Sequence, residues 1–166
     1  MTDHLTLQRF SLGEYVLVFD LDRSILTCRA RGEGQKKIWG KKLKDVHYVE
    51  RVLEDAEKYY VACENGEHTG LFLALHRDTG ATAWFIPGKS FLQIIYGGYL
   101  YLIFIDDRED YFLLKVDRED GRALWHHRVE DDLYEYCFND GVITLKFGSG
   151  LTKSLDLGTG RARVSP

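Results

Sequence analysis

The sequence has no long apolar run. None of its segments approaches the roughly 20 apolar residues that span a bilayer, so we expect no membrane partner. The opening stretch "MTDHLTLQRF" carries Asp, His and Arg where a secretory signal would be apolar. We therefore expect a cytoplasmic protein.

Cysteine is scarce and does not form a pattern. The three residues Cys28, Cys63 and Cys137 are odd in number, lie in apolar runs and show no CxxC spacing. This excludes a disulfide framework, and it gives no clustered ligands for zinc. We expect three buried structural thiols and no metal site.

The sequence has no long run of positively charged residues. The formal net charge is −4 and no long basic stripe stands out, so nucleic acid is not an expected partner. The stretch "GSGLTKS" lacks the Gly directly before Lys-Ser that a phosphate loop needs, and it is expected to be a hairpin turn. "DREDY" and "DREDG" are expected to be exposed acidic turns.

No catalytic arrangement of Ser, His and Asp, or of Cys and His, can be recognised. His126 and His127 are adjacent in an expected strand, so their side chains point to opposite faces and cannot chelate one metal. We expect one to be exposed and the other partly buried.

Aromatic residues and an internal repeat are what the sequence does contain. Ten Tyr, nine Phe and three Trp stand against two Pro and one Met, and aromatic residues favour strands. The stretch "LALHRDTGATAW" at 73–84 returns as "LKVDREDGRALW" at 114–125. A fourth copy at 154–164 has Val164 where Trp stood. A looser first copy, "ILTCRARGEGQKKIW", has its Trp one residue late.

The repeat predicts turns and strands. Its turn glycines and its tryptophans are Gly34, Gly80, Gly121, Gly160, Trp39, Trp84 and Trp125. In "GLFLALHRD" both alternating faces are largely apolar, as expected for a sheet between two others. "VERVLEDAEKYY" has helical spacing but occupies a first-strand position, so we interpret it as strand. We therefore predict a single domain of sixteen short strands, arranged in four units at about 4–43, 46–87, 90–130 and 131–166.

The pattern Ala-x-Asp-x-x-Thr-Gly-x-x-x-Trp resembles the tryptophan-docking repeat of quinoprotein-like (PQQ-type) β-propellers. The second copy matches at Ala74, Thr79, Gly80 and Trp84, with His76 in place of Asp. The resemblance implies an all-β fold of four four-stranded antiparallel blades. It also implies that each Trp packs on the neighbouring blade near its turn Gly.

Two assemblies fit four blades. The chain closes as a four-bladed ring, or it forms half of an eight-bladed homodimeric ring. The family's quinone cofactor is held by adjacent disulfide-bonded cysteines and a calcium ion. This chain has no adjacent cysteines, and we expect no cofactor.

In such a fold the first strand of each blade lines a central channel. The polar residues of these strands are the ligand-binding candidates: Gln8, Arg9, Glu50, Arg51, Gln93 and Glu135. They either pair with one another and close the channel, or bind a small polar ligand.

The expected function is that of a non-catalytic protein-binding module, which engages a protein partner through one face or the channel. The alternative is a small enzyme or small-molecule sensor that uses the channel residues. The binding module predicts an exposed apolar or aromatic patch on one face, whereas the enzyme predicts a deep central pocket with perturbed carboxylates such as Glu50 or Glu135.

Overall fold

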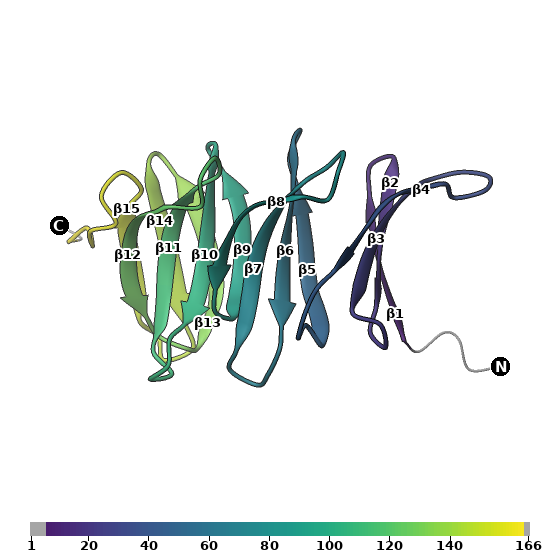
Figure 1. The fold of residues 1–166 in the computed structure, drawn as a ribbon. Helices are drawn as coiled ribbons and strands as arrows, with labels where there is room; N and C mark the ends of the chain where they lie inside the picture. The colour runs from purple at the N-terminus through teal and green to yellow at the C-terminus, as the bar shows by residue number, and fades with distance from the viewer. Residues whose placement is uncertain (1–5, 165–166) are drawn as a thin grey trace. The chain divides into compact units, whose positions relative to one another are not determined.

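A computed structural model describes residues 6–164, and this part of the chain contains fifteen β-strands and no helix (Figure 1). The strands form four antiparallel sheets, each built from strands consecutive in the chain. The first sheet holds β1 (Leu7–Leu12), β2 (Tyr15–Asp20), β3 (Ile25–Ala30) and β4 (Lys37–Lys42). The second holds β5 (Tyr48–Glu54), β6 (Lys58–Glu64), β7 (Gly70–His76) and β8 (Thr82–Pro87).

The other two sheets repeat this order. The third sheet holds β9 (Ser90–Tyr96), β10 (Tyr99–Ile105), β11 (Tyr111–Asp117) and β12 (Ala123–Val129). The fourth holds β13 (Leu133–Asn139), β14 (Val142–Phe147) and β15 (Thr152–Asp156). Between residues 6 and 164 no helix has the length and apolar character needed to cross a bilayer.

The prediction of sixteen strands was wrong by one. In the last predicted strand, "RARVS", Ser165 lies outside the described residues, and residues 161–164 make an isolated bridge between Leu155 and Ala162 in place of a fourth strand. Val164, which stands where the other repeats carry Trp, is 93% exposed. No tryptophan anchors residues 161–164, which are held by main-chain bonds to Ser154 and Asp156 and by the ion pair between Arg163 and Asp156 at 2.8 Å. The segment with helical spacing is β5 followed by β6, as predicted.

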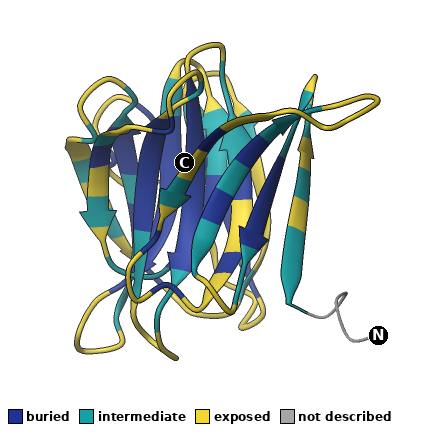
Figure 2. Cartoon of the chain, turned by 45° about the vertical axis from the view of Figure 1, so that its right-hand side comes forward, coloured by how far each residue is buried: buried dark blue, intermediate teal, exposed yellow. Residues whose placement is uncertain are grey.

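The chain divides into two compact units, residues 1–90 and 91–166. The first unit contains the first and second sheets, and its core includes Leu17, Cys28, Val61 and Leu73. The second unit contains the third and fourth sheets, with a core of its own that includes Leu113, Leu145 and Phe147. Figure 2 shows that burial is greatest along the middle strands, where strand β6 is almost wholly buried.

Each unit contains one tryptophan docked on the turn of its next sheet, which confirms the packing implied by the repeat. A Cβ added to Gly80 would lie 2.5 Å from the Trp39 ring, and one added to Gly160 would lie 2.5 Å from the Trp125 ring. The indole N–H of Trp39 donates to the Arg77 carbonyl at 2.7 Å, and that of Trp125 donates to the Leu157 carbonyl at 2.9 Å. Both acceptors stand three residues before the turn glycine.

The repeated turn is the same in three copies. The N–H groups of Gly80, Gly121 and Gly160 each donate to the carbonyl four residues earlier, at 2.7 to 3.0 Å, and all three glycines have positive φ. Glycine adopts this conformation without the strain that a Cβ would bring.

The first turn differs from this pattern. Gly34 also has a positive φ, but its hairpin is one residue longer and nothing lies within 4 Å of its Cβ position. Trp84 packs against Tyr60 and Phe72 of its own sheet, with ring centroids 5.9 and 6.1 Å away.

Candidate functional site

Gln8, the first ligand-binding candidate, holds two strands together. Its side-chain N–H donates to the Val49 carbonyl and its side-chain oxygen accepts the Val49 N–H, both at 2.8 Å. This two-point bond joins β1 to β5 inside the first unit. Both polar atoms of the Gln8 side chain therefore bond the main chain of a neighbouring sheet.

Arg9 is exposed and lies on the opposite face of β1 from Gln8. It lines a hollow of about 480 Å³ on the outer face of the first sheet. We call this feature the cationic hollow. It is lined by Leu7, Arg9, Val18, Asp20, Arg23, Ile25, Thr27, Arg29, Gln35 and Lys37. Sequence reasoning found Arg9 but missed Arg29 and Lys37, because their shared face becomes visible only with the strand register.

The remaining candidates lie on the corresponding first strands. Glu50 and Arg51 are exposed on β5 beside an irregularity in its pairing with β6, and Gln93 is buried on β9. Glu135 on β13 accepts a hydrogen bond from the Lys146 ammonium at 2.8 Å, across the pairing with β14. This contact raises the pKa of Lys146. A ligand-binding role for the six residues stays a prediction.

The structure also tests the predicted burial of the three cysteines. Cys28 and Cys63 are buried as predicted, but the prediction was wrong for Cys137, which is exposed. Cys137 lies on the edge strand β13, where its cross-strand partner is the half-buried Thr144.

His126 is exposed and His127 partly buried, as predicted. Burial, followed by the charge of Lys153, lowers the pKa of His127.

An aromatic cluster on β9 and β13 was not predicted. Tyr96 stacks on Phe138 with ring centroids 4.1 Å apart. Tyr136 and Phe138 form a T-shaped pair with ring centroids 6.1 Å apart. Tyr96 is 40% exposed and Tyr136 is 42% exposed. Tyr134, two residues before Tyr136, is 69% exposed. We call Tyr96, Tyr134, Tyr136 and Phe138 the tyrosine patch.

A signal for the tyrosine patch was present in the stretch "LYEYCFND", where aromatic residues alternate. The patch is connected to the interior of the second unit. Tyr101 lies 5.1 Å from Phe138 and 6.1 Å from Trp125, measured between ring centroids. A continuous series of rings therefore supports Tyr96 and Tyr136 through Phe138.

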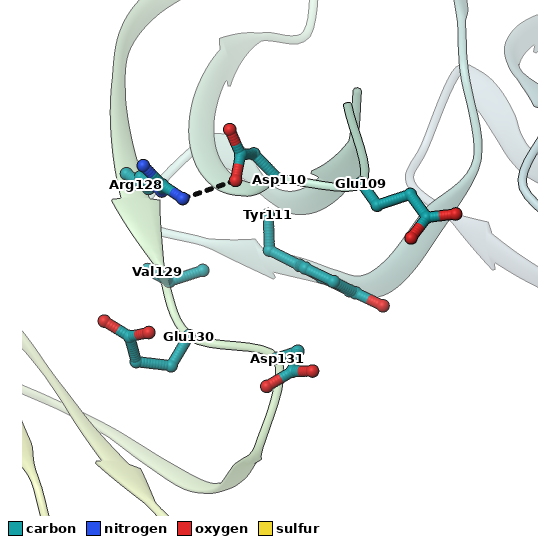
Figure 3. Close-up of a pocket in the computed structure, with 7 residues that line it drawn as sticks. All are labelled: Glu109, Asp110, Tyr111, Arg128, Val129, Glu130 and Asp131. Atoms are coloured by element: carbon teal, nitrogen blue, oxygen red, sulfur yellow. Dashed lines mark hydrogen bonds and ion pairs between the residues drawn. The ribbon is translucent and has the colours of Figure 1, made fainter. Parts of the chain in front are cut away.

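A smaller hollow lies in the second unit between the turn before β11 and the end of β12 (Figure 3). Its volume is about 150 Å³, and it is lined by Glu109, Asp110, Tyr111, Arg128, Val129, Glu130 and Asp131. Arg128 forms an ion pair with Asp110 inside it. The hollow is below the usual size of small-molecule pockets, and its turn is exposed and acidic, as expected for "DREDY".

The cofactor implied by the resemblance does not fit this chain. Cys28, Cys63 and Cys137 lie on β3, β6 and β13, and all three are free thiols. No group of three His, Cys, Asp or Glu side chains in residues 6–164 is placed to hold a metal ion. The adjacent disulfide-bonded cysteines that hold the quinone in that family thus have no counterpart in this sequence.

The sequence matches no protein-family model and no curated protein. Its structure is nevertheless similar to solved structures. Superposition on BamB from Moraxella catarrhalis gives a TM-score of 0.65 at 15% identity, over 92% of this chain and 49% of that one. The computationally designed Ika4 protein gives 0.65 at 11% identity, over 95% and 96% of the two chains.

The fold is that of a β-propeller. A third similar structure is the quinohemoprotein alcohol dehydrogenase from Comamonas testosteroni, with a TM-score of 0.64 and 13% identity over 95% of this chain and 34% of that one. The propeller chain spans about half the length of the BamB that it matches, and nearly all of Ika4. Closure of the propeller within one chain, or pairing of two chains as half-rings, stays a prediction.

Proposed function

We propose that this propeller is a non-catalytic protein-binding module and that the tyrosine patch contacts its partner. The observation that carries the proposal is the exposure of three neighbouring tyrosines, two of which pack on an aromatic series that continues to the buried Tyr101. An exposed cluster of large apolar side chains is the feature that the binding module predicted.

The chemistry of the patch suits a protein partner. Tyrosine offers a large apolar ring for burial and a hydroxyl for a hydrogen bond, and it loses little side-chain entropy on binding. The stacking of Tyr96 on Phe138 fixes one ring before any partner arrives. A pre-positioned ring lowers the entropy that association costs, which favours its use as an anchor.

The test compares three baits: the wild-type chain, a Tyr134→Ser/Tyr136→Ser double variant, and a Phe85→Ser control. Phe85 is 58% exposed and lies on β8 in the first unit, so the control removes one exposed aromatic ring elsewhere. We expect the double variant to lose a protein that the other two baits capture.

The captured protein is then purified and its affinity for each bait measured by calorimetry. Anchor residues of this kind lower affinity by about tenfold or more when truncated. Equal affinity for the wild type and the double variant, or capture of nothing by any bait, would contradict the proposal. Circular dichroism of each variant confirms that the fold is intact.

A further inference from the structure

The outer face of the first sheet is organised in cross-strand rows. Arg9, Val18, Thr27 and Gly40 are register partners on β1 to β4 and form the middle row. The row on one side contains Leu7, Asp20 and Ile25, and the row on the other contains Val16, Arg29 and Lys37. This face points away from the core side chains of Leu17 and Cys28.

Gly40 leaves space that a cation fills. A Cβ added to Gly40 would lie 2.9 Å from the Lys37 ammonium and 4.0 Å from the Thr27 hydroxyl. The Lys37 side chain therefore lies over Gly40 and brings its charge to the end of the middle row. The row then runs from the Arg9 guanidinium across Val18 and Thr27 to the Lys37 ammonium, and Val18 is only 8% exposed.

The two cations at the ends of this row have no counter-ion in the part of the chain that the structure describes. Asp20 is the acidic residue of the hollow, and its carboxylate is paired with Arg23 instead. The Asp20 Oδ2 atom lies 3.8 Å from the Arg23 Nε atom, and the Asp20 Oδ1 atom accepts a hydrogen bond from the Arg23 main-chain N–H. Residues 1–44 contain nine Lys and Arg against five Asp and Glu, although the whole chain is net negative. Clustered charge of one sign attracts a partner of the opposite sign.

We propose that the cationic hollow binds an extended acidic segment of a partner protein, with two carboxylates on either side of an apolar residue. Three steps between strands about 4.8 Å apart separate the positions of Arg9 and Gly40 by roughly 14 Å. An extended segment covers about 13 Å in four residues, and its alternate side chains face the same way. Acidic, apolar and acidic side chains at positions i, i+2 and i+4 therefore meet Arg9, Val18 and Lys37. This binding does not depend on the tyrosine patch.

The probe is a capped pentapeptide with glutamate at both ends, valine at the centre and serine between them. Two matched peptides serve as controls: one with glutamine at both ends, and an isomer with the two glutamates adjacent. Each is titrated into the ¹⁵N-labelled full chain, and amide shifts are followed by NMR. We expect saturating shifts in β1 to β4 with the first peptide. Binding should be at least about tenfold weaker with each control, because the isomer leaves one cation unpaired and the glutamine peptide leaves both unpaired.

The protein variant is Arg9→Gln/Lys37→Gln, and its matched control is Lys36→Gln/Lys44→Gln. Both remove two exposed charges from the same part of the chain, but Lys36 and Lys44 lie outside the hollow. We expect affinity to fall about tenfold in the first variant and to change little in the second. Added salt weakens binding to the wild type.

Four results would overturn the proposal. They are equal weakening in both variants, equal binding of the two glutamate isomers, the absence of saturating shifts, and tighter binding at the hollow by a labelled oligothymidine than by the peptide. A doubled solution mass that disappears in the Arg9→Gln/Lys37→Gln variant would also overturn it, since the occupant would then be a second copy of the chain.

Discussion

The side-chain amide of Gln8 bonds the main chain of Val49 at both its N–H and its C=O, each at 2.8 Å. The two residues are 41 positions apart, on the first strands of successive sheets. The bond lets one side chain continue the hydrogen-bonding pattern of a main-chain ladder where the two sheets meet.

We expect Gln8→Ala to destabilise the first unit by about 1 to 3 kcal/mol, because it leaves two polar groups of a buried valine without partners. Urea unfolding measures the loss. Arg9→Ala, at the exposed neighbouring position, is the control and should change stability by less than about 0.5 kcal/mol. Equal effects of the two substitutions would show that the amide bond contributes nothing specific.

The Trp39 and Gly80 contact predicts a coupled pair of substitutions. Trp39→Ala should cost about 3 to 5 kcal/mol, because it empties a buried indole site. Gly80→Ala should also destabilise, because its Cβ would overlap the ring and its φ is +71°. In the Trp39→Ala background the overlap is gone and only the backbone strain of about 1 kcal/mol remains. A double-mutant cycle by urea unfolding gives the coupling, and strictly additive effects would contradict the contact.

The three thiols should differ in reactivity. Cys28 is 0% and Cys63 is 2% exposed, whereas Cys137 is exposed. A thiol reagent should therefore label one cysteine in the native protein, none in Cys137→Ser, and all three of the wild type after unfolding. Mass spectrometry of the labelled peptides identifies the sites. Rapid native labelling of Cys28 or Cys63 would disprove the burial of β3 and β6.

Stability should fall at alkaline pH, in part through Cys63. Burial raises the pKa of this thiol from 9.0 to about 12. Above the pKa of the unfolded chain, the unfolded state has released the proton that the folded state still holds, so the free energy of unfolding decreases as pH rises through this window. Below the pKa of the unfolded chain, the thiol is protonated in both states and does not affect how the free energy of unfolding varies with pH.

Cys63→Ala should be less stable than the wild type at neutral pH because of the cavity, and its stability should decline less steeply above pH 9.0. Burial also raises the pKa values of Tyr59 and Tyr101 to about 12, and both proteins retain these groups. The difference between the two pH profiles therefore isolates the thiol. Parallel profiles would show that Cys63 keeps an ordinary pKa in the folded chain.

The sequence predicted the parts of this fold that depend on local chemistry. A turn glycine and a tryptophan four residues later are both visible in the sequence, and the resemblance to tryptophan-docking propellers then implied the docking of Trp125 on Gly160. The role of Gln8 could not, because its partner is main chain and any residue at position 49 would offer the same atoms. The cationic hollow was hidden for another reason: the Lys37 charge reaches the middle row only through the absence of a side chain at Gly40.

The indole N–H groups of Trp39 and Trp125 donate hydrogen bonds to main-chain carbonyl oxygens, and these carbonyls belong to residues as different as Arg77 and Leu157. A contact that uses main-chain atoms tolerates wide variation in the side chains around it. Sequences that differ widely elsewhere in each unit can therefore form the same contact from one glycine and one ring.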